Sequence, residues 1–180
     1  MSNMLENKYR TMYQTFFMMF KNLSKSFKGT LFTIFVIFLL DRFSKEYVIF
    51  LSNSNYDPEI FTSSFLNIVL IWNDGIAFGL LSFEDSIFYN AMTILIATII
   101  VVLLFLISKT QKIKKYSYIV ISGGALGNLF DRIIYNSVPD FIDLHYDGFH
   151  WFIFNVADIF ITLGVICLIC DEIFLEKYRR

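Results

Sequence analysis

The feature that most constrains this chain is a twenty-residue apolar run from Trp151 to Cys170, in which Asp158 is the only acidic or basic residue. A run of this length and composition predicts a helix that crosses a lipid bilayer. A lone carboxylate in such a helix costs about 2.5–3.5 kcal/mol on insertion scales, so it marks a functional site by default and needs a polar partner. Asn155 precedes Asp158 by three positions, and on a helix the two side chains would share a face.

Composition places the whole chain in the same class. Of its 180 residues, 56% are hydrophobic, and the mean hydropathy is +0.58, which exceeds what a soluble domain of this length requires. The expected fold class is an all-α membrane protein with four transmembrane helices and a small extracytoplasmic β element. The spans are predicted at about residues 29–51, 87–107, 116–134 and 151–170.

The first span is the least regular of the four. Its uninterrupted apolar part, residues 31–40, would cover only about 15 Å of a hydrocarbon core about 30 Å thick. The helix must therefore continue through the charges that follow. Asp41 and Lys45 stand four residues apart and can pair on the helix surface, as can Arg42 and Glu46.

The third span combines small and polar residues. Gly123 and Gly127 form a small-xxx-small pattern, which permits close packing of helices. At the end of the span come Asn128, Asp131 and Arg132, and Asn128 shares a helix face with both of the others.

Outside the predicted spans, basic residues lie only in alternate segments of the chain. Of the 15 Lys and Arg residues, five lie in residues 1–28, four in 108–115 and three in 171–180, whereas 52–86 and 135–150 contain none. The positive-inside rule then places both termini in the cytoplasm and the two segments without basic residues on the opposite side.

A small β element is predicted in residues 52–86. The stretch from Phe61 to Trp72 is rich in β-branched and aromatic residues, and Asn73-Asp74-Gly75 is a hairpin-type turn. A second short strand is expected at Ile76 to Gly79.

The candidate chemistry rests on carboxylates. No serine or cysteine nucleophile has a plausible base, since Cys167 and Cys170 lie in an apolar helix. His145 and His150 lie in a predicted polar loop without an evident third zinc ligand.

Several aspartates are expected near the outer membrane surface, at the depth of Asp158: Asp41, Asp131 and Asp140. Two carboxylates held close together share a proton, and such a pair can activate a water as general base while it donates a proton as general acid. Spacing alone does not decide which aspartate partners Asp158. A polar network that only holds the helices together and an ion channel or carrier remain open, because intramembrane carboxylates also mark ion pathways.

Five segments together resemble the bacterial lipoprotein signal peptidases (signal peptidase II), a family of membrane aspartic peptidases. The segments are Asp41-Arg42-Phe43-Ser44-Lys45, Asn73-Asp74-Gly75-Ile76-Ala77-Phe78-Gly79, Gly123-Gly124-Ala125-Leu126-Gly127-Asn128-Leu129-Phe130-Asp131-Arg132, Val138-Pro139-Asp140-Phe141 and Phe154-Asn155-Val156-Ala157-Asp158. The resemblance covers about residues 29–175. Any one segment alone is weak, but the five in this order are specific.

The resemblance implies roles for individual residues. Asp140 and Asp158 match the catalytic dyad. The positions that match site-lining and substrate-binding residues are Asn73, Gly75, Asn128, Arg132 and Asn155. The positions that match structural polar residues are Asp41, Lys45 and Asp131. No metal and no cofactor is implied.

The resemblance also implies a function. The family removes signal peptides from prolipoproteins by cleaving just before a cysteine that carries diacylglycerol. The expected partners are therefore a diacylglyceryl-prolipoprotein and membrane lipid, and neither nucleic acid nor an obligate protein partner is inferred. The expected location is the bacterial cytoplasmic (inner) membrane, with the active site near its outer face. The alternative is a small membrane transporter or channel that uses the same carboxylates.

The expected organisation is a cytoplasmic or interfacial extension at residues 1–28, followed by a peptidase domain at 29–175 with an external β cradle at 52–86. Two positions depart from the family pattern. Asn136 stands where glycine is usual, and asparagine tolerates a left-handed backbone. Pro139 stands where an aliphatic residue is usual, and it removes a backbone donor just before Asp140.

Overall fold

The computed structural model describes residues 25–55, 57–75 and 86–175. The chain forms two compact units, residues 1–32 and 33–180, and the site discussed below belongs to the second unit. The cytoplasmic or interfacial extension expected at residues 1–28 lies almost entirely outside the described residues.

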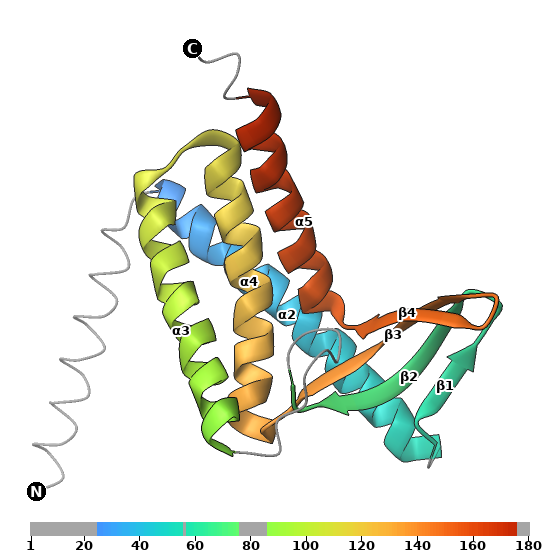
Figure 1. The fold of residues 1–180 in the computed structure, drawn as a ribbon. Coiled ribbons are helices and arrows are strands. Elements are labelled where there is room, and N and C mark those ends of the chain that lie inside the picture. Colours follow the sequence, from blue (N-terminus) through green and yellow to red (C-terminus); the bar gives the residue numbers. More distant parts are fainter. Residues whose placement is uncertain (1–24, 56, 76–85, 176–180) are drawn as a thin grey trace, which may run out of the picture. The chain divides into compact units, whose positions relative to one another are not determined.

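Helices and a small antiparallel sheet make up the described chain (Figure 1). In chain order the elements are α2 (Lys25–Asn55), β1 (Glu59–Thr62), β2 (Leu66–Asn73), α3 (Ser86–Lys109), α4 (Lys112–Tyr135), β3 (Val138–Tyr146), β4 (Phe149–Phe154), α5 (Val156–Cys170) and the π-helical turn η2 (Asp171–Leu175). The strands form one sheet in the order β1-β2-β3-β4. The fold is thus mostly helical, and its sheet is larger than the small β element that the sequence predicts.

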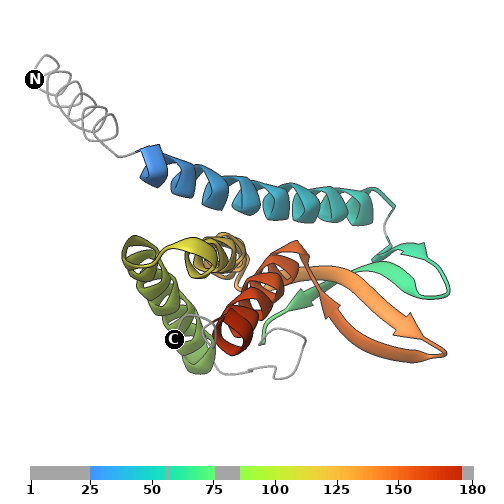
Figure 2. The ribbon, with the colours of Figure 1, turned by 90° about the horizontal axis from the view of Figure 1, so that it is seen from above.

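Helix α4 contacts both α3 and α5, which lie on either side of it (Figure 2). The approach to α5 is close at Gly124, where an added Cβ would lie 2.5 Å from the carbonyl oxygen of Ala157 and 3.0 Å from Ile161 Cγ1. Only glycine fits such a gap between two helix backbones, because any side chain would push them apart.

The small-xxx-small pattern on α4 is confirmed as a packing face. An added Cβ at Gly123 would lie 2.7 Å from the side chain of Ile37, and one at Gly127 would overlap the carboxylate of Asp41. Both glycines therefore face α2, and they allow the charged part of α2 to reach the body of α4.

The sheet joins two segments that are far apart in the sequence. Strand β2 pairs with β3, so that Asn73 stands opposite Val138 and Ile71 opposite Asp140. The β3–β4 turn is Asp147-Gly148, and both residues have positive φ angles, 49° and 77°. Positive φ at both central positions is the requirement of a type I′ hairpin turn, for which Asp-Gly is a preferred sequence.

The prediction of an outer loop at residues 135–150, followed by a helix from residue 151, is wrong for residues 138–154. They form strands β3 and β4, and His145 and His150 occupy paired positions of this hairpin. The residues of β4 are mainly aromatic and β-branched, a composition that favours strand, and the Asp-Gly turn is a hairpin signal. The predicted span 151–170 therefore divides into the end of a strand and a helix that begins at Val156.

The start of α5 also changes the expected position of Asp158. Asn155 is the N-cap residue of the helix, so it does not share a helix face with Asp158 as the sequence suggested. Asp158 lies in the first turn of α5, whereas a helix that began at Trp151 would place it seven residues from the start. The left-handed conformation expected at Asn136 is confirmed, since this residue ends α4 with a φ of 55°.

The length and composition of each helix indicate whether it can cross a bilayer, as predicted for four spans. Among the described residues one helix segment, Tyr89–Lys109, is long and apolar enough by itself to cross a bilayer. Helices α2 and α4 carry charged residues along their length, and α5 has only 15 residues before the π-helical turn. The other three spans remain a prediction. The second strand expected at 76–79 lies outside the described residues.

The contact at Gly124 gives a first prediction. Gly124→Val should lower the melting temperature of the purified protein in detergent, because overpacking of this kind costs about 1–3 kcal/mol or more. Ile133→Val is the matched control, since it places the same side chain at an exposed position of the same helix. Equal melting temperatures for the two variants would contradict the close contact between α4 and α5.

Candidate active site

Asp140 and Asp158 come together at the junction of the sheet and the helices. Asp140 lies in β3, and Asp158 lies in the first turn of α5. Both side chains are almost completely buried, with relative exposures of 2% and 5%. The two acids thus reach one place from a strand and from a helix, which spacing along the sequence could not show.

Asn155 connects the two acids. Its Nδ2 donates to Asp140 Oδ1 at 2.6 Å, and its Oδ1 accepts from the backbone N–H of Asp158 at 3.1 Å. Asp158 Oδ2 in turn accepts from the backbone N–H of Asn155 at 3.2 Å. This is a capping box, in which the N-cap residue and the third helical residue satisfy each other's backbone donors.

The helix terminus suits a carboxylate at this position. The free N–H groups of the first turn carry a partial positive charge, which favours a negative side chain near them. The local sequence Asn-x-x-Asp therefore both starts α5 and holds Asp158 in a fixed orientation.

Asp140 has two amide donors. Asn73 Nδ2 donates to its Oδ2 at 2.8 Å, and Asn155 Nδ2 donates to its Oδ1. Burial raises the pKa of the Asp140 carboxyl to about 6, and the nearby charge of Asp158 adds to the rise. The two amide donors oppose the rise, because they stabilise the ionised carboxylate. Asp140 can therefore carry a proton under mildly acidic conditions.

Asn128 and Arg132 extend from the last turns of α4 toward the same place. Asn128 Nδ2 donates to Asp158 Oδ1 at 2.8 Å. The Arg132 guanidinium donates to the carbonyl oxygen of Gly75 and lies 5.3 Å from the ring centroid of Tyr89. Its Nε is buried without a hydrogen-bond partner among the described residues, which leaves one donor available.

A cavity of about 300 Å³ opens beside these groups. Its polar end is lined by Asn73, Asn128, Arg132, Asp140, Asn155 and Asp158. Its other end is apolar and lies between α3, α4 and α5, with Ile96, Ile121 and Ile161 among its lining residues. Such a cavity can hold an extended apolar ligand with a polar group at the acids.

A second groove of about 270 Å³ also reaches Asp158. It is lined by β4 and α5, through Phe152, Phe154, Ile159 and Leu163. Asp158 and Thr162 line both spaces, so two apolar surfaces meet at one carboxylate.

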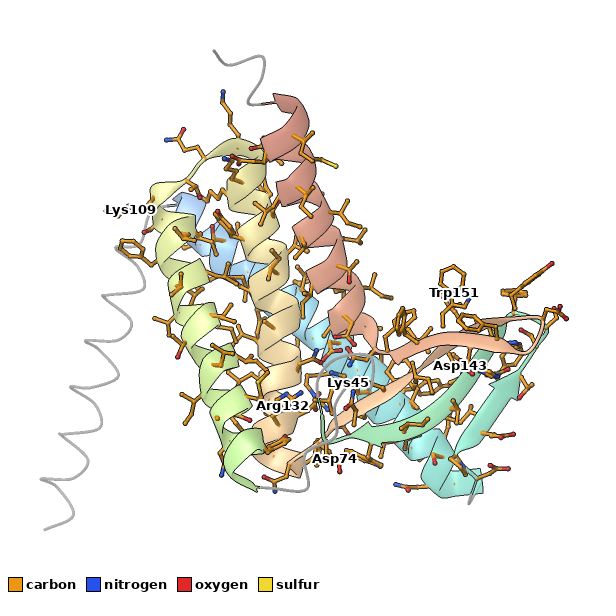
Figure 3. The ribbon with its side chains drawn as sticks, viewed as in Figure 1. Lys45, Asp74, Lys109, Arg132, Asp143 and Trp151 are labelled. Atoms are coloured by element: carbon orange, nitrogen blue, oxygen red, sulfur yellow. The ribbon has the colours of Figure 1, made fainter. Side chains whose placement is uncertain are left out.

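Behind the cavity lies a buried ionic cluster, which consists of Asp41, Arg42, Lys45 and Asp131. Lys45 Nζ lies 2.8 Å from Asp41 Oδ2 and 2.7 Å from Asp131 Oδ2. Arg42 forms a salt bridge with the other oxygen of Asp131. Figure 3 shows Lys45 and Arg132 at the level where the helices meet the sheet.

The cluster is tied to the acids at two points. Lys45 Nζ donates to Asn128 Oδ1 at 2.8 Å. Asp41 Oδ1 accepts from the backbone N–H of Ala157, in the first turn of α5, at 2.9 Å. The three residues predicted to be structural, Asp41, Lys45 and Asp131, thus contact the elements that hold Asp158.

The structure brings all of the predicted site residues into this region, and it adds others. Arg42 was assigned only a partner four residues along its own helix, yet it also pairs with Asp131. Opposite charges at equal depth in two predicted spans were the available signal. Tyr89, whose hydroxyl donates to the carbonyl oxygen of Arg132 at 3.3 Å, had no such signal.

Comparison with known proteins gives consistent matches. The family described as signal peptidase (SPase) II matches residues 33–174. A lipoprotein signal peptidase of Pelagibacter ubique (strain HTCC1062) is 52% identical over 155 residues, which are 86% of this chain and 93% of the relative. One from Anaplasma marginale (strain Florida) is 39% identical over 142 residues, 78% of this chain and 81% of the relative.

Two solved structures, each described as a bacterial membrane enzyme, share the fold. One has a TM-score of 0.68 and 26% identity, and covers 85% of this chain and 92% of its own. The other has a TM-score of 0.66 and 27% identity, and covers 82% of this chain and 94% of its own. The chain therefore belongs to the signal peptidase II family and is located in a membrane.

Proposed function

We propose that this protein is a lipoprotein signal peptidase, an aspartic endopeptidase that cleaves prolipoproteins just before the diacylglyceryl-modified cysteine. The observation that carries the proposal is the pair of buried acids, Asp140 and Asp158, bridged by Asn155 at the polar end of an apolar cavity. The names of the relatives support the same substrate class. They do not favour the alternative of a transporter or channel.

The proposed reaction uses one proton and one negative charge shared by the two acids. The ionised carboxylate takes a proton from a water, whose oxygen attacks the scissile carbonyl carbon. The protonated carboxyl stabilises the developing oxyanion. Proton transfer to the amide nitrogen then releases the cysteine amine, and the signal peptide leaves with a new carboxyl group.

Asp140 is the better candidate for the protonated member at the start of the cycle. Its pKa of about 6 reflects burial and the negative charge of its neighbour. Asp158 lies at a helix N-terminus and accepts hydrogen bonds at both oxygens, which favours a negative charge there. The pair titrates as a unit, so its pH dependence reports two macroscopic pKa values.

The remaining site residues are proposed to bind substrate. Arg132 lines the cavity, and its Nε, which has no hydrogen-bond partner in the part of the chain that the structure describes, is a donor for a substrate carbonyl oxygen. Asn73 holds the Gly75 backbone N–H through its Oδ1 at 2.9 Å, and Arg132 holds the Gly75 carbonyl. The end of β2 is thereby fixed above the acids, as expected of a wall of the substrate site.

The cavity and the second groove match in number the two apolar parts of the proposed substrate. These parts are the signal peptide and the diacylglyceryl chains. The signal peptide lies on one side of the scissile bond and the modified cysteine on the other. Two apolar surfaces that meet at Asp158 allow both parts to remain shielded from water during cleavage.

The four-span arrangement is also part of the proposal. Helices α3, α4 and α5 expose large apolar side chains, including Ile94, Val101, Phe105, Ile133, Leu163 and Ile169. Many large apolar side chains exposed on neighbouring helices are typical of contact with lipid. Both termini are proposed to lie in the cytoplasm, and the sheet and the acids on the outer side.

The proposed roles of the acids predict the effect of removing either one. Asp140→Asn and Asp158→Asn should each lower kcat by at least about a thousandfold, because each removes a group that must gain or lose a proton. The measurement is gel-shift cleavage of a diacylglyceryl-prolipoprotein by purified protein.

The control for this pair is Asp143→Asn. Asp143 is buried on the same strand, but it contacts Asn67 and His150, not the cavity. The Asp143→Asn variant should cleave the substrate at a near-normal rate. Normal cleavage by either Asp140→Asn or Asp158→Asn would remove the assignment of the dyad.

The raised pKa of Asp140 predicts the alkaline side of the pH profile. Asp140 is protonated below about pH 6 and ionised above it, so kcat/KM should fall as the pH rises through its pKa. Asn73→Ala removes a donor that stabilises the ionised form, so the pKa rises further. The alkaline limb should move to higher pH by roughly half a unit to one unit.

The matched control for this measurement is Asn67→Ala. Asn67 lies on the same strand as Asn73 and donates to Asp143 instead of Asp140. The alkaline limb of the pH profile of Asn67→Ala should match that of the wild type. A limb that moves to lower pH in Asn73→Ala, or that moves equally in both variants, would contradict the assignment.

The proposed topology predicts which turns can be labelled from outside the cell. In a variant without Cys167 and Cys170, an impermeant maleimide should label Asp147→Cys in intact spheroplasts. Gln111→Cys, in the basic connection between α3 and α4, should react only after permeabilisation. Labelling in the reverse order would invert the topology.

A further inference from the structure

We infer that Lys45 is a positioning residue for the proposed peptidase, because its ammonium group fixes which end of the Asn128 side-chain amide faces Asp158. The inference rests on the proposed function. It assigns a role in the reaction to a residue that lies behind the cavity and that the sequence analysis treated as structural.

The three N–H groups of Lys45 match three acceptors. Its Nζ donates to Asp41 Oδ2 at 2.8 Å, to Asp131 Oδ2 at 2.7 Å and to Asn128 Oδ1 at 2.8 Å. The Lys45 side chain is fully buried. An ammonium group has three donors and no acceptor, so these contacts use its whole capacity.

Two of the three Lys45 contacts, those with Asp41 and Asp131, neutralise charge, and the contact with Asn128 does not. The cluster contains two carboxylates, Asp41 and Asp131, and two cations, Lys45 and Arg42, so the formal charge of these four residues is balanced, and the exposed Glu46 also pairs with Arg42. The third N–H of Lys45 goes to a neutral amide, whose other end lies at the proposed active site. This contact is therefore the one that links the cluster to the acids.

The two ends of the Asn128 amide cannot be exchanged. Its oxygen accepts from Lys45, and its NH₂ group donates to Asp158 Oδ1 at 2.8 Å. A flipped amide would place NH₂ hydrogens against the ammonium group and the carbonyl oxygen against the carboxylate. Both contacts would be repulsive, because an ammonium group cannot accept a hydrogen bond and a carboxylate cannot donate one.

The orientation of Asn128 affects which form of the dyad is stable. With the amide held as observed, Asp158 accepts one donor at each oxygen, from Asn128 and from the Asn155 backbone. The other charged groups around Asp158 are Asp140 from β3, Arg132 from α4, and Lys45 with Asp41 from α2. Without Lys45 only the contact with Asp158 orients the amide, so its NH₂ group is held less firmly and stabilises the singly ionised dyad less.

The test uses variants that keep the buried charge balanced. Lys45→Met/Asp131→Asn removes one cation and one anion, so the formal charges of Asp41 and Arg42 still cancel, although no salt bridge joins these two residues in the wild type. Lys45→Met/Asp41→Asn leaves the salt bridge of Arg42 and Asp131. Arg42→Met/Asp131→Asn is the matched control, because it disturbs the same cluster but keeps the contact between Lys45 and Asn128.

The measurement is the pH profile of kcat/KM for cleavage of a diacylglyceryl-prolipoprotein, with the melting temperature of each variant in detergent. Both Lys45 variants should move the acidic limb to higher pH by about one unit, which is a tenfold loss on that limb. KM should stay within about twofold, because Lys45 does not line the cavity. The control should keep the acidic limb of the wild type.

Three results would overturn the inference. The first is an acidic limb that does not move in the folded Lys45 variants, and the second is an equal shift in the Arg42 control. The third is failure of both Lys45 variants to fold while the control folds, which would make Lys45 a structural residue only. Wild-type cleavage in the same assay tests the proposed function separately, so its failure is distinguishable from failure of this inference.

Discussion

The side chain of Asn155 is the contact on which the geometry of the site depends. It follows β4, caps α5, accepts from the backbone of Asp158 and donates to the carboxylate of Asp140. The strand that carries one acid and the helix that carries the other are thus joined through one amide. Because a capping interaction contributes about 1 kcal/mol, it is strong enough to fix the start of the helix but needs support from other contacts.

That support comes from the buried ionic cluster of Asp41, Arg42, Lys45 and Asp131. Removing one partner from such a cluster would leave an uncompensated charge, which costs about 3–5 kcal/mol. The cluster holds α2 against α4, and Asp41 holds the first turn of α5 through Ala157. Farther from the acids, α4 and α5 meet closely at Gly164, where an added Cβ would lie 3.0 Å from the carbonyl oxygen of Ser117. Polar contacts thus fix the end of the helices where chemistry is proposed, and close packing holds the rest.

Much of this arrangement was predictable from the sequence. The carboxylate in an apolar run, the charged motif around Asp41 and the polar end of α4 all pointed to one site, since ionisable groups in apolar surroundings must find partners. The resemblance to the signal peptidase II family then named Asp140 as the partner that spacing alone left open. The family itself is shown by the matches to the chain, whereas the roles of the individual residues remain proposals.

The boundaries near residue 151 were not predicted correctly, for a physical reason. An apolar run does not distinguish a buried or interfacial strand from a transmembrane helix, and here the run contains both. The Asp-Gly turn at 147–148, just before the run, signals a hairpin strand, and the capping box at Asn155 marks where the helix begins. The pairing of β2 with β3 could not be read from local patterns, because it joins segments that are far apart in the chain.

The two bridged acids are proposed to hydrolyse one bond in a lipid-modified substrate. The most direct test is mass spectrometry of the products after the purified wild-type protein is mixed with a diacylglyceryl-prolipoprotein, beside the same precursor without the lipid. We expect a single cut just before the modified cysteine, in the lipidated precursor only. An intact lipidated precursor in the presence of folded protein, or a cut at another bond, would contradict it.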